Sequence, residues 1–160
     1  MIATALGQLL GCAPGPTPTP AFASEAEAFA AAEEVYRAYN DALNERREGA
    51  QGADPQRFLT GIALESDVDT QNLLSSSQLH ATGAAILESF TGETVDISGN
   101  VATMTGVVCI DVSAVALLDN SGADVTPPDR DDKVAQRVRF LGTVLSLLIS
   151  EESTAEGSTC

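Results

Sequence analysis

The feature that most constrains this chain is a change of residue pattern at about Gly83. Before it, apolar residues recur at helical spacing; after it, segments rich in Val, Ile, Leu, Thr and Ser are separated by turn residues. Helices followed by consecutive strands predict an α+β domain with the helices packed on one face of an antiparallel sheet. At 160 residues the chain is long enough for one such domain and too short for two.

The first helix is the best marked element. Ser24 followed by Glu27 three residues later is a capping-box pattern, and Gly49 predicts the end of the helix. One apolar stripe runs along it at spacings of three and four, formed by Phe29, Ala32, Tyr36, Tyr39 and Leu43. The pattern predicts an amphipathic helix of about 24 residues that buries this stripe.

Two shorter helices are expected before the strands. Asp54 followed by Pro55 predicts one start, since Asp caps a helix and Pro fits its first turn. Ser66 with Asp67 repeats the capping pattern and predicts another start, in a helix that the serines at 75–77 would end.

Strands are expected over residues 84–97, 101–118, 134–141 and 143–150. Their predicted breaks are at Thr91–Gly92, 98–100, 120–122 and Gly142. In the second strand, Val108 and Ile110 would share one face and Cys109 and Asp111 the other.

Charge and composition exclude several functions. Acidic residues outnumber basic ones by 23 to 8, giving a formal net charge of −15. Such a chain repels phosphate backbones and anionic lipid head groups, so we expect no nucleic-acid partner. His80 is the single histidine, which excludes a multi-histidine metal site, and we expect neither metal nor cofactor.

The N-terminal segment carries an export pattern. Leu9, Leu10, Gly11 and Cys12 resemble the lipobox of bacterial lipoproteins, in which a small residue precedes a cysteine that receives lipid. The resemblance implies a signal peptide over 1–11, lipidation of Cys12 and a position on the outer face of the cell membrane. No basic residue precedes Arg37, so we expect the natural start to lie upstream. The alternative is a chance match in a short apolar leader.

Residues 13–23 predict a spacer. Four of the seven prolines fall in this segment, and alternating Thr and Pro favour extended polyproline II over helix. Eleven residues at ~3.1 Å each would span roughly 34 Å. We therefore divide the chain into a leader (1–11), a lipidated tether (12–23) and one domain (24–160); the alternative for the tether is an N-terminus without fixed structure.

The three cysteines predict one disulfide. If Cys12 carries lipid, Cys109 and Cys160 remain as a pair in an oxidising compartment. Their bond would close a loop of about 50 residues, worth roughly 4 kcal/mol in the chain-entropy model. The alternative is a buried thiol at Cys109 and a free one at Cys160.

The domain over 24–160 resembles the NTF2-like family, whose cone-shaped α+β fold combines a long first helix, short helices and a curved antiparallel sheet. It is similar, more closely, to small uncharacterised secreted lipoproteins of Gram-positive bacteria. The segments that carry this similarity are Ala30–Tyr36, Val108–Ser113, Leu118–Pro127 and the terminal Cys160. The resemblance implies a fold, and a fold transfers no activity.

Enzymes of cone-shaped folds place Asp, His or Tyr inside the cone. The corresponding set here would be Tyr36, Tyr39, His80 and Asp111. The structural alternative is stronger: the tyrosines belong to the helix core, His80 is a surface or structural residue, and Asp111 pairs with Arg137 or Arg139.

Two acidic segments have simpler explanations than metal binding. Asp119–Asp124 lacks the terminal bidentate Glu of a calcium loop and fits a hairpin turn. Asp129–Asp132 follows two prolines and predicts a solvated loop.

We therefore assign no catalytic residue. The sequence predicts a lipid-anchored domain that binds an unknown small ligand or a protein partner. The alternative is an isomerase or dehydratase-like enzyme with a pocket in the cone, and a homodimer is a further possibility by analogy of fold.

Overall fold

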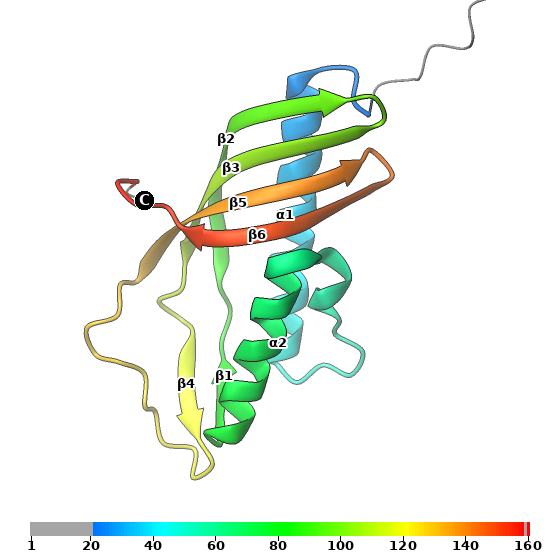
Figure 1. Ribbon diagram of the computed structural model, residues 1–160. Coiled ribbons are helices and arrows are strands. Elements are labelled where there is room, and N and C mark those ends of the chain that lie inside the picture. The colour runs from blue at the N-terminus through cyan, green and yellow to red at the C-terminus, as the bar shows by residue number, and fades with distance from the viewer. Residues whose placement is uncertain (1–20, 159) are drawn as a thin grey trace, which may run out of the picture.

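The computed structural model describes residues 21–158 and 160 and has the predicted α+β class (Figure 1). Two α-helices come first, α1 (Glu25–Arg47) and α2 (Gly61–Ser76), with one turn of 3-10 helix, η1 (Pro55–Phe58), between them. The strands follow: β1 (Leu79–Thr82), β2 (Ile86–Ser98), β3 (Val101–Asp111), β4 (Ala116–Asp119), β5 (Lys133–Thr143) and β6 (Ser146–Thr154).

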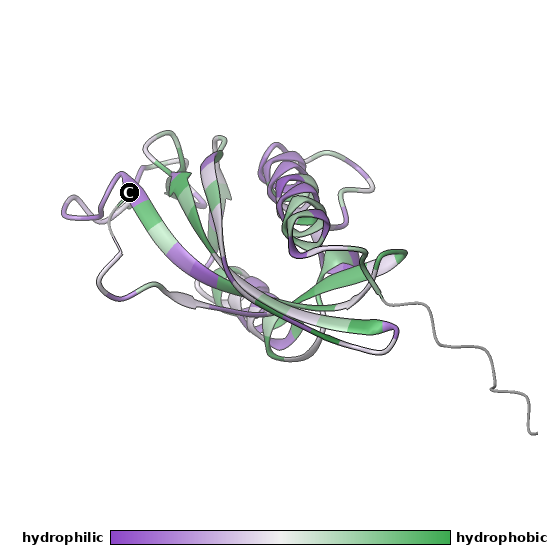
Figure 2. Cartoon of the chain, turned by 90° about the horizontal axis from the view of Figure 1, so that it is seen from above, coloured by the Kyte–Doolittle hydropathy of each residue, from purple (hydrophilic) through white to green (hydrophobic). Residues whose placement is uncertain are grey.

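The strands form two antiparallel sheets. The larger has the order β2-β3-β5-β6, and the smaller pairs β1 with β4. The smaller sheet extends the molecule below the larger one, because β1 leads into β2 and β4 follows β3 (Figure 1). Seen from above, the larger sheet is curved, and hydrophobic and hydrophilic residues follow one another along its strands (Figure 2).

The core lies between α1 and the inner face of the larger sheet. Its largest side chains are fully buried and come from the two inner strands, β3 and β5, and the edge strand β6: Met104, Val108, Val138, Phe140 and Ile149. Ala28, Ala32 and Tyr36 of α1 are buried against this face. The small alanines let the helix lie close to the strands, while α2 packs on β6 and β1 nearby.

The predicted start of α1 is confirmed. Ser24 is the N-cap residue, and its Oγ accepts a hydrogen bond from the backbone N–H of Glu27 at 3.2 Å. The carboxylate of Glu27 accepts in turn from the backbone N–H of Ala23 at 2.7 Å. The first bond satisfies a backbone donor that the first helical turn leaves free, and the second ties the residue before the N-cap to the helix.

The predicted start at Ser66 is wrong. Helix α2 runs without a break through this position from Gly61. The side chain of Asp67 does not cap a helix; it binds Arg46 of α1, and this tertiary contact accounts for an acidic residue in mid-helix.

The predicted break at Thr91–Gly92 is also wrong, since β2 continues through it. A Cβ atom at Gly92 would lie 2.5 Å from the ring of Phe29. Glycine is required here because the helix side chain contacts the strand backbone, which is a packing role and not a turn role.

The other strand boundaries differ in detail. The strand predicted over 101–118 divides into β3 and β4, and the last hairpin turns at Val144–Leu145, two residues beyond Gly142. The breaks predicted at 98–100 and 120–122 are confirmed. The sequence pattern does not predict strand β1.

A β-bulge in β6 decides which glutamate faces inward. Ile149 pairs with Phe140 and Glu151 pairs with Arg139, so Ser150 is the extra residue. Strict alternation from Ile149 would place Glu151 on the inner face. The bulge reverses the alternation, so Glu152, opposite the buried Val138, takes the inner position.

Candidate ligand-binding cavity

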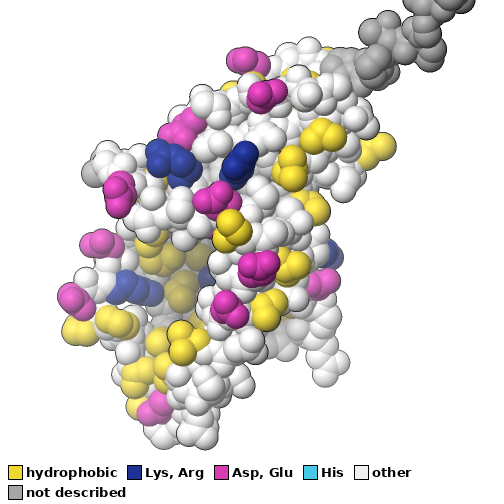
Figure 3. Space-filling view, in the orientation of Figure 1, with side chains coloured by type: hydrophobic (Ala, Val, Ile, Leu, Met, Phe, Trp, Pro, Cys, Tyr) yellow, Lys and Arg dark blue, Asp and Glu magenta, His cyan; other side chains and the backbone are white. Residues whose placement is uncertain are grey.

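A cavity of about 570 Å³ lies below the larger sheet, between the C-terminal half of α1, α2, β1 and the end of β6. Figure 3 shows the molecule hollowed below the sheet, with hydrophobic side chains inside the hollow. The apolar part of the cavity lining comprises Leu43, Ala63, Leu74, Leu79 and Ala81. A volume of this order is typical of sites for small organic molecules.

Glu152 and two tyrosines form the polar end of the cavity. Tyr36 donates a hydrogen bond to Oε1 of Glu152 at 3.2 Å, and Tyr39 donates to Oε2 at 3.2 Å. The Tyr36 hydroxyl also lies 3.1 Å from the side-chain oxygen of Gln136. The two rings meet edge to face, with centroids 5.7 Å apart. The carboxyl group is therefore held in one place by α1.

Burial raises the pKa of Glu152, and the tyrosine hydrogen bonds offset part of that rise. Burial, followed by the charge of Glu152, raises the pKa of Tyr36 and of Tyr39 far above the ordinary tyrosine value. Both tyrosines therefore stay protonated donors. A carboxyl group held by two donors in a poorly hydrated site can accept or release a proton closer to neutral pH than an exposed glutamate.

An ion pair joins α1 to α2 at the cavity wall. Both guanidinium nitrogens of Arg46 donate to Asp67, at 3.0 and 2.6 Å, and Gln56 of η1 donates to the same carboxylate at 3.0 Å. Burial alone would raise the pKa of Asp67, but the hydrogen bonds from Arg46 and Gln56 and the Arg46 charge outweigh it and lower that pKa. Asp67 stays ionised and its charge is fully compensated.

Arg47 is the second arginine of the wall. Its Nη1 donates to Oδ1 of Asn44 at 2.7 Å, and it makes no ion pair with any residue that the structure describes. Burial, and then the neighbouring charge of Arg46, lower the pKa of Arg47. Asn44 is itself fixed, because its side chain also binds both the backbone N–H and the carbonyl of Ala85 at 2.9 Å.

The four side chains considered as a catalytic set are not all brought together. Tyr39 and His80 line the cavity, and Tyr36 reaches it through Glu152. Asp111 lies elsewhere, at the end of β3, where its Oδ1 accepts from the backbone and hydroxyl of Ser113 at 2.9 and 2.6 Å. Within the described residues, Asp111 makes no ion pair with Arg137 or Arg139: Arg137 pairs with Glu93, and Lys133 is opposite Asp111.

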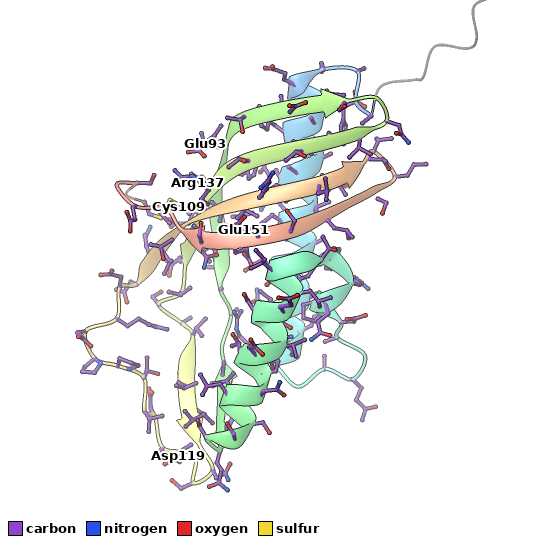
Figure 4. All side chains as sticks on the ribbon, viewed as in Figure 1. Glu93, Cys109, Asp119, Arg137 and Glu151 are labelled. Atoms are coloured by element: carbon purple, nitrogen blue, oxygen red, sulfur yellow. A yellow bond between two sulfur atoms is a disulfide. The ribbon has the colours of Figure 1, made fainter. Side chains whose placement is uncertain are left out.

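A second, shallower groove of about 340 Å³ lies on the outer face of the larger sheet. Arg137 of β5 reaches across β3 to Glu93 of β2, with N–O distances of 3.0 and 3.1 Å (Figure 4). Glu151 lines the same groove, opposite Arg139. Its charges are exposed and largely neutralise one another, so this face resembles an ordinary solvated sheet surface.

Cys109 and Cys160 lie at disulfide distance on this outer side, with Cα atoms 5.4 Å apart. This arrangement fits the predicted bond and places the C-terminus beside β3. Cys12 and most of the predicted tether lie outside the described residues.

The acidic turn at Asp119 is self-contained. Oδ1 of Asp119 accepts from the backbone and hydroxyl of Ser121 and from the backbone of Ala123, at 2.7 to 3.0 Å. Within residues 21–158 and 160, no three His, Cys, Asp or Glu side chains form a group that could hold a metal ion. In the same residues, no helix combines the length and hydropathy needed to cross a bilayer.

Sequence reasoning missed Glu152, Arg47 and Asp67 as site residues. Glu152 follows Glu151 in a strand, and nothing local shows which one turns inward. The available signal for Arg47 and Arg46 was two adjacent arginines at the end of an amphipathic helix, a pattern that the helix dipole explains equally well.

Comparison with known proteins identifies the fold and no family. No family model matches the chain, and no curated protein matches it. Among solved structures, the chain is similar to the intermembrane space region of the chloroplast protein ARC6, with a TM-score of 0.54 and 15% identity. The match covers 79% of this chain and 95% of that one. At this identity the similarity concerns the fold alone.

Proposed function

We propose that this protein is a small-molecule-binding module whose site is the cavity between α1, α2, β1 and β6. The observation that carries the proposal is a cavity of about 570 Å³ in which apolar side chains of α1, α2 and β1 lie beside polar and charged groups, several of them held by hydrogen bonds. The outer groove is smaller, about 340 Å³, and lies on a solvated sheet face lined mainly by threonines and charged side chains.

The domain belongs, in this proposal, to the NTF2-like cone-shaped folds. A long first helix covers one face of a curved antiparallel sheet (Figures 1 and 2), and the cavity is lined by α2 and the end of β6. These features support the resemblance found in the segments around Ala30–Tyr36 and Val108–Ser113.

The module is further proposed to be a lipoprotein on the outer face of the cell membrane, anchored through Cys12. The lipobox-like residues and the pairing of Cys109 with Cys160 support this placement, since disulfides persist outside the cytosol. Mass spectrometry of the mature chain should find diacylglycerol on Cys12, and Cys12→Ser should abolish it. An unprocessed, unlipidated N-terminus in the producing cell would contradict the anchor. Sedimentation tests the accompanying prediction of a homodimer.

Binding to the cavity can be tested with an uncharged fluorescent probe, N-phenyl-1-naphthylamine. Its emission should rise with the protein and should be lost in Thr70→Trp, which places a large ring at an exposed cavity position of α2. The matched control is Asp69→Trp, one residue away on the same helix and outside the cavity lining. Equal probe binding by both variants would contradict binding at this site.

A second function, proton transfer of the isomerase kind, is favoured by one observation. Glu152 and His80 line the same cavity from β6 and β1, and burial raises the pKa of the Glu152 carboxyl group. Carboxyl and imidazole side chains are the usual general acids and bases of enzymes. Conversion of 3-cyclohexen-1-one to its conjugated isomer tests for such a base. A rate above buffer that Glu152→Gln removes would support catalysis, and a rate equal to buffer would exclude it for this probe class.

A further inference from the structure

The charges that line the cavity are unequally compensated. Asp67 receives hydrogen bonds from Arg46 and Gln56, so the charge of its carboxylate is paired by residues of the protein itself. Glu152 accepts one hydrogen bond on each oxygen from the tyrosines of α1. Both carboxyl groups thus have their partners in the chain itself.

Arg47 is the exception. A guanidinium has five N–H donors, and the contact recorded for Arg47 uses one nitrogen, with the neutral oxygen of Asn44 as acceptor. Its side chain is half-buried, lines the cavity and stands next to the like charge of Arg46. Arg47 is therefore a partly desolvated cation without a carboxylate partner in the described chain. Such a cation binds an anionic ligand favourably.

The rest of the cavity limits what that anion can be. The lining includes apolar side chains, of which Leu43, Leu74 and Leu79 are the largest, together with uncharged polar residues of α2. The chain as a whole carries a net charge of −15, which disfavours multiply charged anions more strongly than singly charged ones. One negative charge attached to a hydrocarbon body satisfies both conditions.

We infer that the cavity takes a small amphipathic monoanion, with its head group on the Arg47 guanidinium and its apolar part against the leucines. This inference rests on the proposed function, because it specifies the ligand class of the same cavity. It makes Arg47 a binding residue that discriminates between ligands of equal length by their charge.

Three ten-carbon ligands that differ in head group test the inference: 1-decanesulfonate, 1-decanol and decylammonium. Each is measured by displacement of N-phenyl-1-naphthylamine from the full domain. We expect decanesulfonate to bind most tightly and Arg47→Gln to weaken it at least tenfold, while decanol changes little, since a charged hydrogen bond carries that much discrimination. The control is Arg37→Gln, which removes an exposed arginine of the same helix that is paired with Glu33 at 2.7 Å.

The outcomes separate this inference from the proposed function. Equal affinities for the three ligands, or an Arg47→Gln variant with unchanged preference, would overturn the anion inference and leave a binding cavity. Preference for decylammonium would overturn it as well. If neither the probe nor any ligand binds the wild-type protein, the cavity is not a binding site and both proposals fail. Circular dichroism of both arginine variants establishes that they are folded.

Discussion

The hydroxyl of Tyr39 on α1 donates a hydrogen bond to Oε2 of Glu152 on β6 at 3.2 Å, across a separation of 113 residues. Tyr36, one turn earlier, donates to the other oxygen, so both oxygens of one carboxyl group are bound by one helix. These two hydrogen bonds fix α1 against the edge strand β6 and hold the Glu152 carboxyl group at the wall of the cavity. Its consequences for stability depend on pH.

The first prediction concerns that pH dependence. Burial raises the pKa of Glu152 in the folded state above the unfolded value of about 4.3. The folded protein therefore keeps a proton that the unfolded chain loses, so this group's contribution is fully present below about pH 4.3 and is lost as the pH rises to the folded pKa. The free energy of unfolding should fall over that interval, and Glu152→Gln should remove this part of the fall.

Urea denaturation at several pH values measures the effect. At pH 7 the Glu152→Gln variant should differ from the wild type by no more than about 1 kcal/mol, since an amide can still accept from one tyrosine. Glu156→Gln is the control, because Glu156 is exposed and lies two residues beyond the end of β6. The same pH profile in wild type and Glu152→Gln would contradict the prediction.

The second prediction concerns the pair between Arg46 and Asp67. Only 7% of the Asp67 side chain is exposed, against 25% for Arg46, so removal of the arginine leaves a buried carboxylate held by Gln56 alone. Arg46→Met should lower the free energy of unfolding at pH 7 by about 3 kcal/mol. The double variant with Asp67→Asn should recover part of the loss, because no buried charge then remains.

The same pair has a pH dependence opposite to that of Glu152. The pKa of Asp67 is lowered in the folded state, so the contribution is present above the unfolded value of about 3.9 and is lost as the pH falls through the folded pKa. Wild type should therefore lose more stability than Arg46→Met on acidification below about pH 3.9. Equal losses in acid would show that the pair contributes nothing to folding.

How much of this could be predicted from the sequence depends on how local each cause is. The capping residues Ser24 and Glu27 act within one turn, so their pattern identifies the start of α1 correctly. Asp67 has the same local appearance, but its partner Arg46 lies 21 residues earlier and overrides the capping interpretation. The α+β class follows from periodicity over many residues, which single exceptions do not disturb.

The site residues were harder to predict, because tertiary packing determines which side chains reach the cavity. Alternation along β6 points to Glu151, and the extra residue Ser150 moves Glu152 into the cavity instead. No feature of the neighbouring residues marks this bulge. Tyr36 and Tyr39 were expected in the core of the helix stripe, and they are buried there, but their role as donors to Glu152 needs the fold.

The third prediction concerns the contact between Gly92 and Phe29. A methyl group at position 92 would meet the Phe29 ring at 2.5 Å, a distance that forces the helix or the strand to move. Gly92→Ala should cost about 1–3 kcal/mol in the free energy of unfolding, as overpacking does. Phe29→Ala removes the ring, so Gly92→Ala should cost less in the Phe29→Ala background than in the wild type, and a double-mutant cycle measures this difference. Additive effects would mean that the clash is relieved elsewhere.

The last prediction concerns Cys109 and Cys160, which close a loop with a sequence separation of 51. Cross-linking a loop of this size restricts the unfolded chain, so Cys160→Ser should lower the free energy of unfolding by up to about 4 kcal/mol. Reduction of the wild type with dithiothreitol should produce the same loss, while the reductant should leave Cys160→Ser unchanged. Because Cys160 lies on the outer side of the sheet, away from the cavity lining, probe binding by the folded variant should match the wild type. A wild type that is indifferent to reductant and yields two free thiols would show that the two cysteines are not bonded in the isolated protein.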